Sequence, residues 1–206
     1  METDHFHPKP EPPNQKPKSK LLMKPLLLLI PLWLFGGSLN AQLSFSDTFP
    51  GGQPGAHWTG DTNRFIVNTD GKLQLQDTAG GSAWLSTRAP AADSACWEGY
   101  LQLDFAPSSS NRLRLFVAAS QPQLDAADLR GYFLQIGASG SDDRLELWRQ
   151  DPDGATLLLA GTPGAVAAEP VLRFRLTRSR SGEWTLQADY GGGHDFQTEG
   201  STLDTT

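Results

Sequence analysis

The chain has 206 residues, enough for one domain and a leader, and its formal net charge is −6 at pH 7. Residues 1–41 hold five lysines and three acidic residues, so the remainder carries a net charge of −8. An acidic domain repels phosphate backbones and anionic lipid headgroups, which argues against nucleic acid and against a membrane surface as partners.

The first predicted element is a leader that takes the chain out of the cytoplasm. An apolar run at 26–35 is about ten residues long, which is too short to span a bilayer but typical of a signal-peptide core. Lys24 gives this run a basic flank, and Ala41 is a small residue at the expected cleavage point. Residues 23–41 are therefore predicted to be a Sec-type signal peptide. We expect the exported protein to be secreted or held on the outer cell surface, with no stable membrane insertion after cleavage.

Residues 1–22 are rich in Pro and Lys and too polar to bury a core. Because Met23 and Lys24 begin a complete signal peptide by themselves, we interpret residues 1–22 as a disordered or mis-called upstream extension. A genuine long basic region ahead of the signal peptide is the alternative. Both interpretations leave residues 42–206 as the exported domain.

From Gln42 onward, apolar and polar residues alternate with period two and helical periodicity is absent. A further strand-like run covers 43–49, and the stretch 121–130 has room for one helical turn. Many short strands between turn signals predict one all-β domain, a sandwich or a barrel. The ten main strands are predicted at 64–68, 72–76, 82–88, 96–105, 111–118, 131–137, 143–150, 155–160, 171–178 and 183–190.

Three antiparallel hairpins are predicted from the register that matches apolar residues with apolar residues. They place Leu103 opposite Leu113, Phe174 opposite Leu186, and Leu147 opposite Leu157. Each hairpin then has one apolar and one polar face. This is the pattern of an antiparallel β-sandwich in which each sheet buries one face.

The polar faces of these strands are the candidate binding surface. A solvated sheet face is the simpler interpretation of such residues, and a binding face for an extracellular glycan or a surface protein is the alternative. The candidate residues are Glu98, Tyr100, Gln102, Asp104, Arg112, Arg114, Arg173 and Arg175.

An ordered series of short segments spans the predicted domain. They read WTGD at 58–61, FIVN at 65–68, GKLQL at 71–75, FAPSSSN at 105–111, GYFLQIG at 131–137, LWRQD at 147–151 and GEW at 182–184. This series resembles the N-terminal domain of bacterial secreted proteins that contain a lamin-tail domain and use type IX sorting. The resemblance covers the chain from about Phe45 to its end. It implies a concanavalin A-like, LamG-like jelly roll and supplies no catalytic residue.

Proteins of that family continue with further strands, a lamin-tail domain and a sorting domain, none of which follows here. The chain ends on the polar stretch 201–206, in which the sequence indicates no closing strand. The run at 43–49 is expected to be the first strand, paired with a late strand beyond residue 206. We therefore expect the domain 42–206 to be C-terminally truncated and to lack its last strands.

The sequence contains no recognisable catalytic centre. Sandwich glycosidases of this fold carry two carboxylates on one strand face at spacing i, i+2 or i+4, so that an acid and a nucleophile lie about 5–5.5 Å apart. Here Tyr100 and Gln102 separate Glu98 from Asp104, so the pattern is missing. His57 and His194 have no metal-ligand spacing. We predict that the chain is not an enzyme and needs no cofactor.

Calcium is the one metal for which the sequence offers oxygen ligands, at Asp142, Asp143, Asp151 and Asp153. A tight turn explains the Asp-Pro-Asp-Gly run at 151–154 without a metal, so we predict no metal site and keep calcium as the alternative.

Three functions remain open. The first is a non-catalytic binding or adhesion module within a larger surface protein, with carbohydrate as the expected ligand. The second is a structural spacer without a ligand, and the third is a glycan-active enzyme of the same fold. Fold analogy alone cannot choose among them.

Overall fold

The computed structural model describes residues 44–50, 52–77, 80–89, 93–140 and 142–206. These residues belong to one compact unit, Gln42–Thr206. The predictions for the upstream extension and the signal peptide fall on residues 1–43, outside the described residues.

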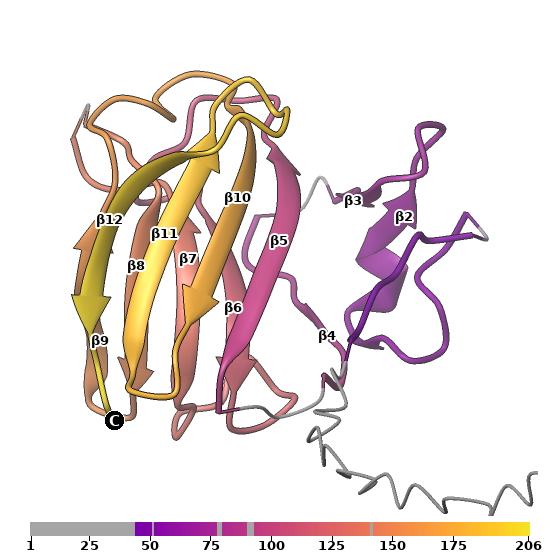
Figure 1. The fold of residues 1–206 in the computed structure, drawn as a ribbon. Helices are drawn as coiled ribbons and strands as arrows, with labels where there is room; N and C mark the ends of the chain where they lie inside the picture. Colours follow the sequence, from indigo (N-terminus) through magenta and orange to yellow (C-terminus); the bar gives the residue numbers. More distant parts are fainter. Residues whose placement is uncertain (1–43, 51, 78–79, 90–92, 141) are drawn as a thin grey trace, which may run out of the picture. The chain divides into compact units, whose positions relative to one another are not determined.

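Two four-stranded antiparallel sheets pack face to face as a sandwich (Figure 1). The first sheet has the order β12–β11–β10–β5 and is formed by β5 (Ala95–Gln102), β10 (Val171–Arg178), β11 (Glu183–Asp189) and β12 (Gln197–Leu203). The second has the order β6–β7–β8–β9 and is formed by β6 (Leu113–Ala119), β7 (Gly131–Ile136), β8 (Glu146–Asp151) and β9 (Gly154–Ala160). The predicted all-β antiparallel sandwich is confirmed, and the jelly-roll topology stays a prediction.

The segment ahead of the sandwich holds four short strands in two small antiparallel sheets. β1 pairs with β4 and β2 pairs with β3. The elements are β1 (Thr59–Gly60), the 3₁₀ turn η1 (Thr62–Arg64), β2 (Phe65–Val67), β3 (Leu73–Leu75) and β4 (Leu85–Ser86). Residues 44–49 form no strand, so the expected first strand at 43–49 is wrong over its described residues. Residues 121–130 form tight turns rather than a helical turn.

Polar contacts organise this first segment. Asp47 accepts hydrogen bonds from Trp58 Nε1 at 2.7 Å, Phe49 N at 2.7 Å and His57 Nε2 at 2.8 Å. The bond from Trp58, followed by that from Phe49, lowers the pKa of Asp47. Among the described residues, every fully buried apolar side chain comes at Leu103 or later. The sandwich therefore contains the core.

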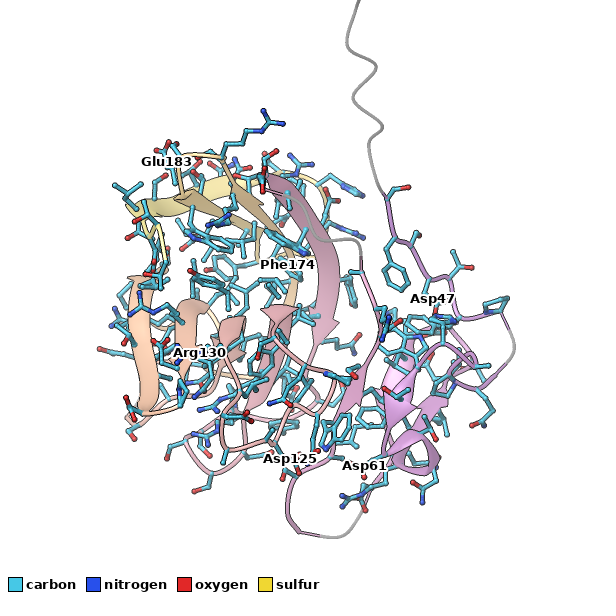
Figure 2. All side chains as sticks on the ribbon, turned by 90° about the horizontal axis from the view of Figure 1, so that it is seen from below. Asp47, Asp61, Asp125, Arg130, Phe174 and Glu183 are labelled. Atoms are coloured by element: carbon cyan, nitrogen blue, oxygen red, sulfur yellow. The ribbon has the colours of Figure 1, made fainter. Side chains whose placement is uncertain are left out.

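Alternation of side chains along each strand places one set of residues between the two sheets. Trp184, Leu176, Leu147 and Leu134 are almost completely buried there, and Phe174 points into this interior (Figure 2). Trp184 stacks on Trp97 with ring centroids 5.7 Å apart. Removal of this apolar area from water is the main contribution to the stability of the sandwich.

The predicted hairpin of 97–105 with 111–117 is wrong, although its inward residues are right. β5 pairs with β10, with Leu101 opposite Leu172, and β6 pairs with β7, with Leu115 opposite Leu134. Leu103 is 8% exposed and Leu101, Leu113 and Leu115 pack on the core. β5 and β6 face each other across the sandwich. Their apolar sides therefore meet in the core, so the apolar pattern fits this arrangement as well as it fits a hairpin.

The other two hairpins form with registers that differ from the prediction. Phe174 lies opposite Ala188 instead of Leu186, a shift of two residues that leaves every side chain on its predicted face. Leu147 lies opposite Leu159 instead of Leu157, because a β-bulge follows Leu147 in this pair.

The expectation that 201–206 holds no strand is wrong, because β12 covers residues 197–203 and pairs with β11. The residues after it are also anchored. Asp204 is buried and accepts a hydrogen bond from Arg149 Nη1 at 2.8 Å, and the Tyr132 hydroxyl donates to the Thr206 carbonyl at 2.9 Å. Arg149 and Tyr132 belong to the second sheet, so these contacts join the two sheets at one end.

Candidate functional site

The pairing of β5 with β10 creates the candidate site. Glu98 lies opposite Arg175, and Tyr100 lies opposite Arg173. Because Leu172, Phe174 and Leu176 of β10 point into the core, the residues that alternate with them point outward. We call this the cationic face: the outer side of β5 and β10 with the neighbouring segments that contact it, comprising Lys72, Glu98, Tyr100, Gln102, Arg173, Arg175, His194 and Phe196.

Carboxylates lie among the basic groups of the cationic face: Asp189 lies opposite Arg173, and Glu98 is the one that the arginines contact most closely. Arg175 donates to Glu98 Oε2 from Nε at 3.1 Å and from Nη2 at 3.0 Å. Arg173 Nη1 is 4.0 Å and His194 Nδ1 is 3.6 Å from Glu98 Oε1. The side chains are 26% to 37% exposed for the arginines and Glu98, and such partly solvated pairs contribute little to stability. The arrangement therefore orients charges more than it stabilises the fold.

Three basic side chains of the cationic face contact aromatic rings. The guanidinium carbon of Arg175 lies 4.1 Å from the centre of the Phe196 ring. Lys72 Nζ lies 4.4 Å from the Tyr100 ring, and the Arg173 guanidinium carbon lies 5.9 Å from the same ring. A cation over an aromatic face is attracted by the ring quadrupole. These contacts restrict three flexible basic side chains to one surface.

A chain of hydrogen bonds extends the cationic face along β5. The Tyr100 hydroxyl donates to Gln102 Oε1 at 3.0 Å, and Gln102 Nε2 donates to Asp104 Oδ1 at 2.9 Å. Lys72 Nζ also lies 3.4 Å from Gln102 Oε1. Neutral and charged hydrogen-bonding groups thus stand side by side on an exposed strand.

The loop 190–196 brings His194 and Phe196 to the cationic face. Asp189 accepts hydrogen bonds from the backbone N–H groups of Gly191 at 2.7 Å and Asp195 at 2.9 Å. These bonds, the one from Gly191 first, lower the pKa of Asp189. Gly192 has φ +74°, and a Cβ there would lie 3.0 Å from the Tyr100 ring. Glycine therefore lets the loop pack closely against Tyr100.

Five of the eight residues predicted from the sequence come together on this face: Glu98, Tyr100, Gln102, Arg173 and Arg175. Asp104 continues the same row through its bond with Gln102. Arg112 and Arg114 do not belong to the site, because Arg114 lies on β6 of the second sheet and Arg112 just precedes that strand. The prediction placed them there because it paired β5 with β6.

Three residues of the cationic face were missed from the sequence. His194 and Phe196 follow the three glycines 191–193, beyond the last predicted strand. Lys72 lies at the start of a short strand-like run far from β5 in sequence. The only available signal in the sequence was an aromatic residue just after a Gly-rich turn. This signal does not show which strand the residue lies against.

The residues proposed as calcium ligands mostly have partners from the protein itself. Asp143 accepts a hydrogen bond from Ala138 N at 2.8 Å, and Asp142 lies 3.6 Å from Arg144 Nη2. Asp151 lies 2.8 Å from Arg149 Nε and, with Asp153, lines an open depression of about 350 Å³ over the β8–β9 turn. Within the described ranges, no three His, Cys, Asp or Glu residues gather as a metal site would require.

Comparisons with protein-family models, with curated proteins and with solved structures found no match to this chain. In the part of the chain that the structure describes, no helix has the length and apolar character needed to cross a membrane.

Proposed function

We propose that this protein is an extracytoplasmic, non-catalytic binding module that attaches to polysaccharide through its cationic face. The observation that supports this proposal best is the convergence of four separate segments on one outer sheet face. Residues from the turn near Lys72, from β5, from β10 and from the loop 190–196 contact one another there. These contacts hold the outward side chains of the four segments in one fixed arrangement.

The chemistry of this face suits a sugar polymer. Gln102 and Tyr100 offer hydrogen-bonding groups for hydroxyls, and the guanidinium groups offer paired N–H donors of fixed geometry. An open sheet face accommodates a long chain better than it encloses a small molecule, which needs a concave pocket. Export by a signal peptide and a jelly-roll topology belong to the same proposal and are supported by the sequence.

The arrangement of acids favours binding over catalysis. Asp104 comes six residues after Glu98, which corresponds to about 20 Å along an extended strand, far more than the separation of glycosidase carboxylates. Glu98 is engaged by Arg175, and the Asp189 carboxylate is engaged by backbone N–H groups. Neither is placed as a general acid beside a second free carboxylate.

Affinity gel electrophoresis of the purified full-length chain in gels containing different polysaccharides tests this proposal. We expect at least one polysaccharide to retard the protein, and we expect the double variant Gln102→Ala with Arg175→Ala to remove the retardation. Arg112→Ala is the matched control, since this exposed arginine lies outside the cationic face. Unretarded migration in every gel would indicate a structural spacer. In a separate reducing-end assay on the same polysaccharides, steady release of reducing ends would indicate an enzyme.

A further inference from the structure

The basic side chains of the cationic face are balanced by neighbouring carboxylates. Arg173 lies opposite Asp189, and Arg175 donates two hydrogen bonds to Glu98. The formal charges cancel over the following six side chains of the face and its border: Lys72, Arg173 and Arg175 with Glu98, Asp104 and Asp189. The whole chain has a net charge of −6. It therefore repels a polyanion, and these balanced charges do not offset that repulsion.

The outer side of the first sheet continues beyond the cationic face with uncharged polar residues. Thr177, Thr185 and Ser201 lie opposite one another on β10, β11 and β12, and Gln187 lies opposite Thr198. We call these five residues the uncharged rows. Thr185 Oγ1 and Ser201 Oγ are 2.9 Å apart, and Gln187 Nε2 is 3.4 Å from Thr198 Oγ1. Charged side chains commonly protect edge strands, yet residues 198 and 201 of the edge strand β12 are exposed and uncharged.

The uncharged rows adjoin the cationic face directly. The strands β5, β10, β11 and β12 lie side by side in one sheet (Figure 1). Arg175 lies opposite Glu98 on one side and opposite Gln187 on the other, so a line of outward side chains crosses the sheet from Glu98 to Thr198. Neighbouring strands are separated by about 4.8 Å, which makes this line about 14 Å long. An extended polymer can therefore contact both surfaces at once.

We infer that the ligand is an uncharged polysaccharide that lies across the strands, from the cationic face onto the uncharged rows. Hydroxyl and side-chain amide groups both donate and accept hydrogen bonds, so the uncharged rows match the hydroxyls of a sugar. A charged polymer must compete with the internal partners of the arginines, and its charges lose water over rows that carry no opposite charge. This inference rests on the proposed function and names the class of its ligand.

Titration calorimetry of the full-length chain with matched polymers tests the charge of the ligand. Hydroxyethyl cellulose and carboxymethyl cellulose form one set, and dextran with its sulfate and diethylaminoethyl derivatives forms a second. We expect an uncharged polymer to bind more tightly than its charged derivatives. We also expect its affinity to persist as salt is raised, because salt screens attraction between charges. Binding of charged derivatives alone, with an affinity that falls as salt is raised, overturns the inference.

The double variant Thr185→Val with Gln187→Leu tests the path of the ligand. It removes a hydroxyl and an amide from the uncharged rows, and we expect it to weaken the binding of the uncharged polymer about tenfold. The matched control, Thr156→Val with Gln150→Leu, removes the same groups from the second sheet. Thermal melts establish which variants fold. Ser201→Ala, a smaller change in the same rows, is expected to weaken binding severalfold and decides the question if the double variant does not fold.

The outcomes separate the inference from the proposed function. Binding that the Gln102→Ala, Arg175→Ala variant loses and the folded Thr185→Val, Gln187→Leu variant retains confines the ligand to the cationic face. That result, or a preference for a charged derivative, overturns the inference while a polysaccharide-binding module survives. Absence of binding to any polymer overturns both.

Discussion

The two sheets of the sandwich are similar on their inner faces and differ on their outer faces. Phe133 on the outer side of the second sheet is 0% exposed, because Phe116 lies 5.0 Å and Trp148 lies 6.4 Å from its ring and the Arg114 guanidinium lies 4.8 Å above it. Burial also lowers the pKa of Arg114. On the first sheet, Gln102 and Glu98 are exposed and the arginines reach solvent. The second outer face is closely packed, and the first is open to solvent.

The largest expected effect concerns the packed face. Phe133→Ala should lower the free energy of unfolding by about 3–5 kcal/mol, because it removes a fully buried ring and leaves a cavity. Tyr100→Ala on the cationic face should cost much less, because that ring is only partly buried. Urea unfolding of both variants measures the difference. Equal costs would mean that the two outer faces are not distinct in packing.

A smaller effect is expected where the two sheets meet. Removing the charge in Asp204→Asn should cost about 1–3 kcal/mol at pH 7, since Asp204 is buried and bonded to Arg149. Burial by itself would raise the pKa of Asp204, but hydrogen bonds from Thr206 and the charge of Arg149 bring it below the usual range.

The sign of the pH dependence follows from that lowered pKa. The carboxylate contributes stability at pH values above the unfolded pKa of about 3.9, and this contribution is lost as the pH falls through the lower folded value. The deficit of Asp204→Asn relative to the parent should therefore shrink below about pH 4. A deficit that stays constant from pH 7 to pH 3 would show that the charge of Asp204 is not involved.

A local effect is expected at the edge of the cationic face. Asp189→Ala should leave the melting temperature nearly unchanged and increase hydrogen exchange in residues 191–195, because two backbone N–H groups lose their acceptor. Asp189→Asn keeps an acceptor oxygen and should show a smaller increase. In the parent, the lowered pKa of Asp189 should preserve this protection below the ordinary aspartate pKa of about 3.9, until the pH falls through the lowered value. Unchanged exchange in Asp189→Ala would contradict the role given to these bonds.

The sequence predicted the strands better than it predicted which strands are neighbours. Alternation identified the ten main strands and most inward residues of the three predicted hairpins, because burial of one face dictates it. Leu157 is the exception, since the bulge after Leu147 leaves it 44% exposed. It could not identify neighbours, so β5 and β6 were paired although they belong to opposite sheets. β12 was not predicted because its residues are polar and Gly200 interrupts the alternation next to a bulge. Lys72 and Phe196 join the site only through tertiary packing.

Glu98→Gln is expected to have the smallest effect on stability. The same substitution should increase the affinity for the ligand. Glu98 is 32% exposed, so Glu98→Gln should change the free energy of unfolding by only about 0–1 kcal/mol. The carboxylate competes with a ligand for the same arginines, because Arg175 donates two hydrogen bonds to it and Arg173 faces it. Its removal frees those donors, so a polysaccharide that retards the parent protein should bind several-fold more tightly.

Glu183→Gln is the matched control for this prediction, since it removes the same charge from the exposed start of β11 (Figure 2). A gain in affinity that is equal in both variants would reflect net charge alone. A gain confined to Glu98→Gln would place the ligand on the arginines that Glu98 now occupies. Weaker binding in Glu98→Gln would mean that this carboxylate orients the arginines rather than competes for them, and the open face would then depend on its own ion pairs for its binding geometry.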